Sequence, residues 1–267
     1  KMLIFLMRKY YHLIIILFIL SSCTEIKKTV PLSDSSGQKI YIMRPIQLRF
    51  DEQIKTQVIV VIDVFRAFTT AAYVLDHNPV TYILASDSAV VSRLISNFNN
   101  PVLIGKSEKG ANLIYDVPNS PTRVQDITIV GKNVLHRTAA GASGILLAKE
   151  ANIVLAAGFI NASATAEYIK TLPNTEIIII PMGHEGNTPS LEDNICAEYI
   201  KALIHGKKLE LIKFLPILQE GSGKYFFSQD QWQYPKEDFF RCLEVDRFNF
   251  IIKATIMNDY AILTRGH

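Results

Sequence analysis

The stretch Gln57-Val-Ile-Val-Val-Ile62 runs directly into the polar segment Asp63-Val-Phe-Arg66. A continuous β-branched run is typical of a strand buried on both faces, as in a parallel sheet covered by helices. In open α/β sheets, ligands bind beyond the carboxyl ends of the strands. The sequence therefore predicts an α/β enzyme whose chemistry is centred on the loop from Asp63 to Arg66.

Alternating strands and helices extend this unit along the chain. Further strands are expected at Thr81–Ala85, Pro101–Ile104, Asn133–Leu135, Asn152–Ala156 and Glu176–Pro181. Helices are expected at Ala67–Leu75, Ser88–Phe98, Gly144–Glu150, Ala162–Thr171 and Ser190–Leu203. The alternation predicts right-handed crossovers and a three-layer α/β/α fold with a largely parallel sheet, as one domain or as two α/β lobes. After Gly206 the pattern weakens, and Phe248–Ile256 stays undecided between helix and strand.

The first 42 residues differ in kind from the rest of the chain. Residues 1–22 combine Arg8-Lys9, an apolar run and a Leu-Ser-Ser ending before Cys23, which is typical of a bacterial lipoprotein signal peptide. Residues 23–42 are interpreted as a polar tether, and residues 43–267 as the catalytic domain. A genuine signal would give an anchored or exported protein in contact with the membrane only through this segment. A misassigned start would give a cytoplasmic one.

The composition limits the classes of function. The formal net charge is +3 over 267 residues, and no basic run is interleaved with aromatic residues, so nucleic acid is not an expected partner. The expected partner is a small phosphorylated anion, and a homo-oligomer is compatible with the sequence. No cysteine pair has metal or redox spacing, so Cys196 and Cys242 are expected to be buried apolar residues.

Three carboxylates are candidates for a metal site. Asp63 follows an apolar strand, where an unpaired carboxylate is costly. Glu192 and Asp193 fall in the first turn of the helix that follows the last expected strand. Mg²⁺ binds through one or two carboxylates plus water, so Mg²⁺ is the expected cofactor. The structural alternatives are an ion pair of Asp63 with Arg66, a helix cap, and complementarity to a helix dipole.

Groups suited to anion binding follow other strands. Arg66 presents a planar fork for phosphate or sulfonate oxygens, and Thr69 and Thr70 lie near a helix N-terminus. Lys106 adds positive charge after the third strand, beside Glu108. The Arg137–Gly144 segment, which includes Thr138, has glycines and hydroxyls that could cradle an anion through main-chain N–H groups.

Familiar phosphate-handling motifs are absent from the sequence. Gly221-Ser-Gly-Lys224 lacks the upstream glycine and following hydroxyl of a P-loop. Asp63-Val-Phe65 has no second aspartate two residues after the first, which disfavours an aspartyl nucleophile and favours a metal ligand at Asp63.

Taken in order, six segments resemble the 2-phosphosulfolactate phosphatase (ComB) family. They are Val58–Thr70, Gly105–Gly110, Asn119-Ser-Pro121, Arg137–Gly144, Ala157–Ala162, and Met182–Ala197 with its Leu191-Glu-Asp193. The resemblance implies a Mg²⁺-dependent acid phosphatase that converts 2-phosphosulfolactate to sulfolactate and phosphate, a step toward coenzyme M. By position it points to Asp63, Arg66, Thr69, Thr70, Glu108, Asn119, Glu192 and Asp193.

The chain departs from the family pattern at two places. Phe68 stands where a threonine is common, and Ala139-Ala140-Gly141-Ala142 replaces Thr-Asn-Gly-Thr. Both changes are expected to remove polar groups near the bound anion. They motivate a rival hypothesis, a non-catalytic, lipid-anchored anion-binding protein that retains the fold. A further alternative is a phosphatase that works through phospho-aspartate at Asp63.

Overall fold

The computed structural model describes residues 38–48, 57–106, 113–207 and 209–267, all within the compact unit Ser33–His267. The expected signal peptide, Cys23 and Glu108 lie outside the described residues. Among the described helices, none has both the length and the hydrophobicity that crossing a membrane requires. Cys196 and Cys242 are buried and unpaired, as the sequence predicts.

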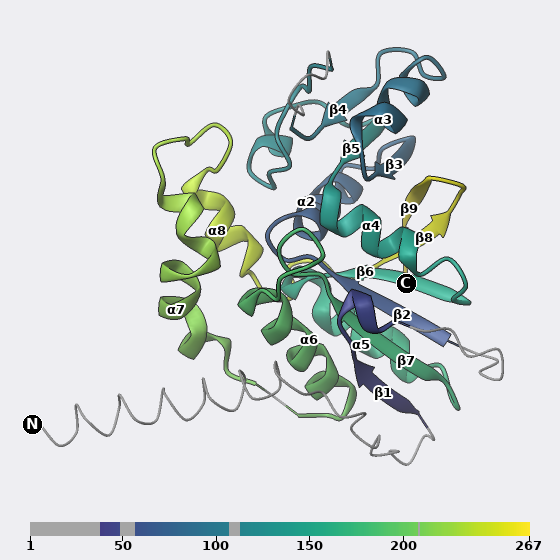
Figure 1. Ribbon diagram of the computed structural model, residues 1–267, viewed down its shortest axis with the longest axis vertical. Helices are drawn as coiled ribbons and strands as arrows, with labels where there is room; N and C mark the ends of the chain where they lie inside the picture. Colours follow the sequence, from purple (N-terminus) through teal and green to yellow (C-terminus); the bar gives the residue numbers. More distant parts are fainter. Residues whose placement is uncertain (1–37, 49–56, 107–112, 208) are drawn as a thin grey trace, which may run out of the picture. The chain divides into compact units, whose positions relative to one another are not determined.

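Within the described residues, nine strands form one sheet of order β1-β7-β2-β6-β8-β9-β3-β5-β4 (Figure 1). The bounds of the strands are β1 Lys39–Ile42, β2 Gln57–Ile62, β3 Thr81–Ala85, β4 Val102–Ile104, β5 Asn133–Arg137, β6 Ile153–Ala157, β7 Glu176–Pro181, β8 Ile251–Ile256 and β9 Tyr260–Gly266. The α-helices are α2 Ala67–Asp76, α3 Ser88–Ile95, α4 Ala139–Leu147, α5 Ala162–Lys170, α6 Leu191–Ile204, α7 Leu215–Glu220 and α8 Lys236–Cys242, with short 3-10 turns between them.

The side chains of β2 alternate between two apolar layers. Val58, Val60 and Ile62 pack in a cluster that also contains residues of α5, α6 and α8. Ile59 and Val61 pack on the opposite face in a cluster with residues of α2 and α4. Because helices cover both faces, the predicted three-layer α/β/α fold is confirmed.

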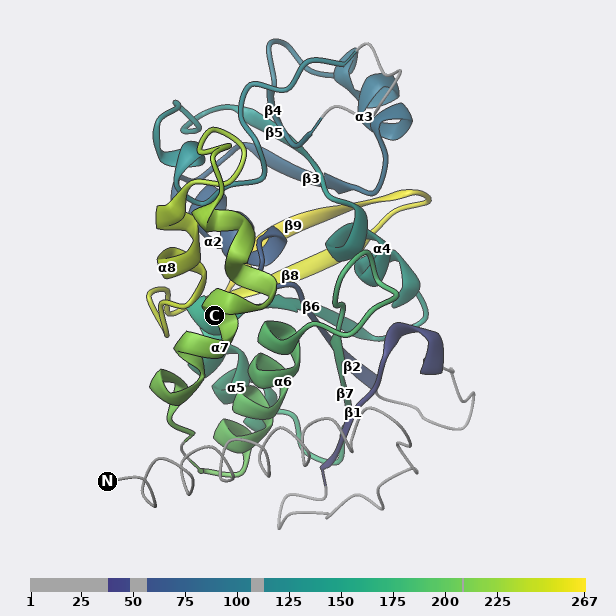
Figure 2. The ribbon, with the colours of Figure 1, turned by 60° about the vertical axis from the view of Figure 1, so that its left-hand side comes forward.

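The sheet contains two parallel groups of strands that run in opposite directions. β1, β7, β2 and β6 are mutually parallel, and so are β3, β5 and β4. The antiparallel hairpin β8–β9 lies between them and reverses the direction (Figure 2). Because of this reversal, the carboxyl ends of the two groups do not share one edge of the sheet. α4, which follows β5, nevertheless packs against β2, and its Gly141 lies beside Asp63.

The structure moves two expected boundaries and decides one stretch that the sequence left open. The sheet begins at Lys39, inside the expected tether, because Lys39–Ile42 pairs with β7. α4 begins at Ala139 rather than Gly144, so the expected anion-cradling loop is mostly the first turn of a helix. Most of the undecided stretch Phe248–Ile256 is strand β8, and its hairpin partner β9 was not predicted from the sequence.

Candidate active site

Asp63 directly follows β2 and lies four residues before the first residue of α2. Its Oδ1 accepts the main-chain N–H of Ala67 at 3.1 Å, and a main-chain hydrogen bond from Gly141 of α4 also reaches this carboxylate. A Cβ on Gly141 would lie 2.9 Å from Ala67 Cβ and 3.1 Å from Asp63 Oδ2. Only a glycine lets the backbone of α4 come this close, so Gly141 helps to build the environment of Asp63.

Asp193, in the first turn of α6, holds two loops together. Its Oδ1 accepts the N–H of Val64 at 2.8 Å, and its Oδ2 accepts the N–H of Gly183 at 2.8 Å. Each carboxylate oxygen therefore binds a loop that follows a different strand, β2 or β7. This arrangement favours a positioning role for Asp193.

Glu192 is buried beside Asp193 and accepts a short hydrogen bond from the hydroxyl of Ser222. Ser222 begins a 3-10 turn, Ser222–Phe227, in the C-terminal part of the chain. The charge of His184 also acts on Glu192 and favours its ionised form. A residue of α6 is thus hydrogen-bonded to a C-terminal segment that the sequence did not predict to be part of the site.

Three buried carboxylates, Asp63, Glu192 and Asp193, make up what we call the acid cluster. Burial, opposed in part by the Ala67 hydrogen bond and reinforced by the charge of Glu192, raises the pKa of Asp63 to about 6. Burial, with the charges of Glu192 and Asp63, raises the pKa of Asp193 well above its ordinary value. Burial likewise raises the pKa of Glu192. The cluster therefore concentrates negative charge that the protein does not fully compensate.

The acid cluster does not form a complete metal site from protein side chains alone. In the part of the chain that the structure describes, no group of three or more His, Cys, Asp or Glu side chains is arranged to hold a metal. Mg²⁺ keeps several waters and uses one or two carboxylates plus substrate phosphate. Asp63 and Glu192, whose charges repel each other, are the acids that would hold such an ion.

Arg66 does not pair with Asp63, which was the structural alternative. It is the N-cap residue of α2, and its peptide bond with Phe65 is cis. Its Nη1 donates to Asp238 Oδ2 at 2.7 Å and to the carbonyl of Gln233 at 2.8 Å. Its positive charge nevertheless acts on Asp63 and opposes in part the rise in the pKa of that carboxyl. Arg66 thus lies between the acid cluster and α8.

Asp238 also holds the turn that contains Asn119. Its Oδ1 accepts the hydroxyl of Ser120 at 2.9 Å and the N–H of Thr122 at 2.9 Å. Asn119 precedes these residues, and its Oδ1 is buried without a hydrogen-bond partner among the described residues. Asp238 therefore joins Arg66 and the Asn119 turn, two elements that the sequence predicts to bind substrate.

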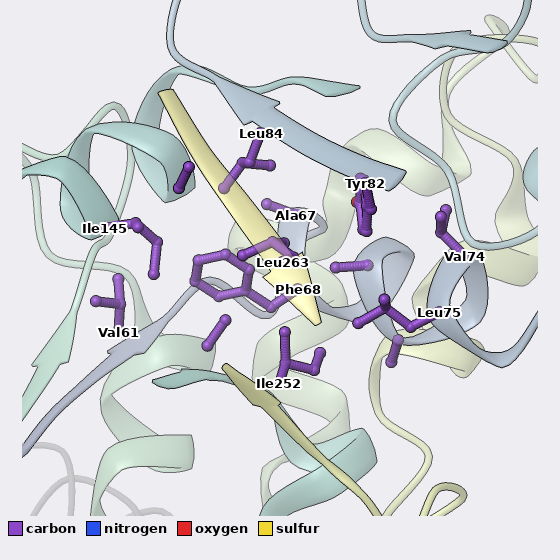
Figure 3. Packing of buried hydrophobic residues seen from close by; sticks show 14 of the residues in the cluster. Val61, Ala67, Phe68, Val74, Leu75, Tyr82, Leu84, Ile145, Ile252 and Leu263 are labelled. Atoms are coloured by element: carbon purple, nitrogen blue, oxygen red, sulfur yellow. The ribbon is translucent and has the colours of Figure 1, made fainter. Parts of the chain in front are cut away.

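The two threonines of α2 point into the protein. The hydroxyl of Thr69 donates to the Val64 carbonyl at 3.0 Å, and both threonines are fully buried. The hydroxyl of Thr70 is buried without a hydrogen-bond partner among the described residues. Phe68 packs in the core with Ile145 and Leu263 (Figure 3), and the tip of its ring lies near Gly141. Whether a polar side chain at this position would reach a bound anion stays a prediction.

The remaining predicted anion-binding residues lie around the end of β5. Arg137 is half-buried, and Thr138 is buried with its N–H donating to Ala85. Lys106 is exposed after β4. Sequence reasoning missed His136, whose Nδ1 lies 2.7 Å from the Tyr82 hydroxyl. Burial, followed by the charges of Arg66 and Arg137, lowers the pKa of His136 to about 3, which indicates a neutral ring near two guanidinium groups.

Comparisons with known proteins all indicate the same protein family. The profile of the 2-phosphosulpholactate phosphatase family matches residues 43–219. A probable 2-phosphosulfolactate phosphatase from Bacillus subtilis (strain 168) is 30% identical over 205 residues, covering 73% of this chain and 86% of the relative. A probable 2-phosphosulfolactate phosphatase from Clostridium perfringens (strain SM101 / Type A) is 29% identical over 165 residues, covering 60% of this chain and 66% of the relative. With Asp63, Glu192 and Asp193 brought together as its sequence motifs imply, the chain belongs to the 2-phosphosulfolactate phosphatase family.

Proposed function

We propose that this protein hydrolyses a phosphate monoester of a small anion, with 2-phosphosulfolactate as the first substrate to test. The observation that carries the proposal is the acid cluster at the end of β2, with Arg66 close enough for its positive charge to oppose in part the rise in the pKa of Asp63. A metal-dependent phosphatase uses cationic groups to bind phosphate and carboxylates to hold the metal beside it. Family membership supplies the reaction class and the candidate substrate.

In this mechanism each residue has a defined task. Asp63 and Glu192 would hold Mg²⁺, and Asp193 would keep the Val64 and Gly183 loops in place around it. When bound, the metal supplies positive charge to phosphoryl oxygens and makes a nearby water more acidic. Arg66 would bind the anionic substrate through N–H groups other than those already bonded to Asp238 and Gln233.

The nucleophile is proposed to be water rather than Asp63. Asp63 accepts main-chain hydrogen bonds from Ala67 and Gly141, which hold its carboxylate in one orientation and reduce its nucleophilicity. Trapping with beryllofluoride separates the two routes, because only an aspartyl nucleophile would form a stable adduct there. An adduct on Asp63 would replace water by the carboxylate in this scheme.

The test is phosphate release from 2-phosphosulfolactate and from generic monoesters, with Mg²⁺ and after chelation. We expect turnover that requires the metal and prefers the doubly anionic substrate. If no monoester is hydrolysed while inorganic phosphate binds tightly, the protein is the non-catalytic anion binder instead. If turnover survives complete chelation, the assignment of Mg²⁺ is wrong.

A further inference from the structure

The C-terminal part of the chain beyond residue 219, which the family profile does not cover, contributes side chains to the candidate site. Ser222 donates to Glu192, and Asp238 of α8 accepts from Arg66. Phe226 and Tyr234 belong to the same part and lie against the Arg66 guanidinium. The site is therefore closed by a segment whose sequence carries no recognised phosphatase motif.

The Arg66–Asp238 contact is a fully enclosed ion pair. The side chains are 7% and 0% exposed, and the Nη1–Oδ2 distance is 2.7 Å. The guanidinium carbon lies 5.0 Å from the ring centre of Tyr234 and 5.7 Å from that of Phe226. Aromatic rings at these distances attract the cation and restrict the orientation of its plane.

Only one nitrogen of Arg66 is used by these contacts. Both N–H groups of Nη1 are used, one on Asp238 and one on the Gln233 carbonyl. Among the described residues, Nη2 and Nε donate no hydrogen bond. The two N–H groups of Nη2 and the one of Nε can therefore donate to a ligand. The same guanidinium acts electrostatically on both Asp63 and His136, whose pKa values it lowers.

We propose that Asp238 is the positioning residue of the site: it orients the Arg66 guanidinium so that Nη2 and Nε face the phosphorylated anion, and it ties the Asn119 turn to the same point. This inference rests on the proposed function for its substrate. Asp238 does not touch the reacting atoms. It acts through Arg66 with Oδ2, and through Ser120 and Thr122 with Oδ1.

The test compares Asp238→Asn with wild type for kcat, KM and the Kd of inorganic phosphate. A misplacement of about 1 Å can cost on the order of 100-fold in rate, so we expect kcat/KM to fall roughly 10- to 100-fold. The loss should appear mainly in KM, with a parallel rise in the phosphate Kd. In a double-mutant cycle, Asp238→Asn should add little to Arg66→Lys, because both changes misplace the same guanidinium.

Asp259→Asn is the matched control. Asp259 forms an Arg–Asp pair of the same 2.7 Å length with Arg93, but its side chain is 48% exposed and remote from this network. It should leave KM, kcat and phosphate affinity unchanged. A folded Asp238→Asn protein with wild-type KM and phosphate Kd would overturn the proposal, and so would full additivity with Arg66→Lys.

A milder variant covers the case in which Asp238→Asn does not fold. Ser120→Ala removes only the hydroxyl bonded to Oδ1 of Asp238 and leaves the ion pair intact. We expect a smaller rise in KM and phosphate Kd, and their invariance would contradict the link to the Asn119 turn. Phosphate binding also separates the two proposals. If the wild-type protein binds phosphate but hydrolyses no monoester, the proposed function is wrong. The phosphate Kd values of wild type and Asp238→Asn still decide whether Asp238 positions Arg66.

Discussion

The acid cluster and the Arg66–Asp238 pair are two groups of buried charges with opposite electrostatic environments. In the acid cluster, like charges lie together, and burial and mutual repulsion raise the pKa values of Asp63 and Asp193. In the Arg66–Asp238 pair, opposite charges meet at 2.7 Å, and further hydrogen bonds satisfy the carboxylate. The carboxylate of the pair is therefore satisfied by groups of the protein, whereas the acids of the cluster raise one another's pKa values. Clustered acids with raised pKa values are more frequent at functional sites than elsewhere, which is why we place the proposed chemistry there.

The largest effect should come from Asp63→Asn, which removes charge from the acid cluster. Loss of one electrostatic contact to a transition state costs on the order of 100- to 1,000-fold in kcat, and we expect a loss of this size or greater. Steady-state kinetics with saturating Mg²⁺ measures it. Wild-type activity in the variant would show that the cluster is not catalytic.

Stability should respond in opposite directions in the two regions. Asp238→Ala leaves Arg66 buried and uncompensated, and breaking a buried pair in this way costs about 3–5 kcal/mol. Glu192→Gln should raise the free energy of unfolding without Mg²⁺, because it removes repulsion while the amide oxygen can still accept from Ser222. Urea unfolding without metal compares them. A loss of stability in both variants would mean that the acid cluster is compensated.

Gly141→Ala should damage catalysis more than folding. The new methyl group would meet Ala67 and Asp63 Oδ2 at 2.9 and 3.1 Å, so α4 must move away from the carboxylate. Overpacking of this kind costs about 1–3 kcal/mol, and we expect kcat to fall further than this loss of stability explains. The control is Gly131→Ala, whose Cβ would meet nothing within 4 Å, although its φ of +71° adds local strain. Equal activity in the two variants would contradict the role of Gly141.

The smallest effect should be a pH dependence of stability without metal. The pKa of Asp63 is raised from 3.8 to about 6, so its contribution is present below pH 4 and is lost as the pH rises through 6. The lowered pKa of His136 acts oppositely, with stability lost as the pH falls from 6.5 toward 3. Thermal unfolding across pH 3–8 should show both. Glu192→Gln should weaken the acid-side part of the profile without abolishing it, because burial is a larger cause of the raised pKa of Asp63 than the charge of Glu192, and it should leave the His136 part unchanged. An unchanged profile would argue against repulsion between these acids.

The parts of the site that follow regular local patterns could be predicted from the sequence. β2 is a continuous apolar run, so Asp63 at its end was predictable, and Glu192-Asp193 was marked by a helix start after an apolar strand. Asp238 gave no such signal. An aspartate after Pro235 at the start of a helix is also what a simple helix N-terminus contains. Its pairing with Arg66 depends on residues far apart in the chain.

The sequence by itself determined the α/β class, the positions of most strands and helices, and the acids of the site. Periodicity and capping act over a few residues, so they can be read locally. Only the tertiary structure decided that β8–β9 reverses the second group of strands, that Phe68 points into the core, and that Asp238 rather than Asp63 pairs with Arg66. These outcomes depend on which distant surfaces pack together, and burial then makes a partner for each charge an energetic requirement.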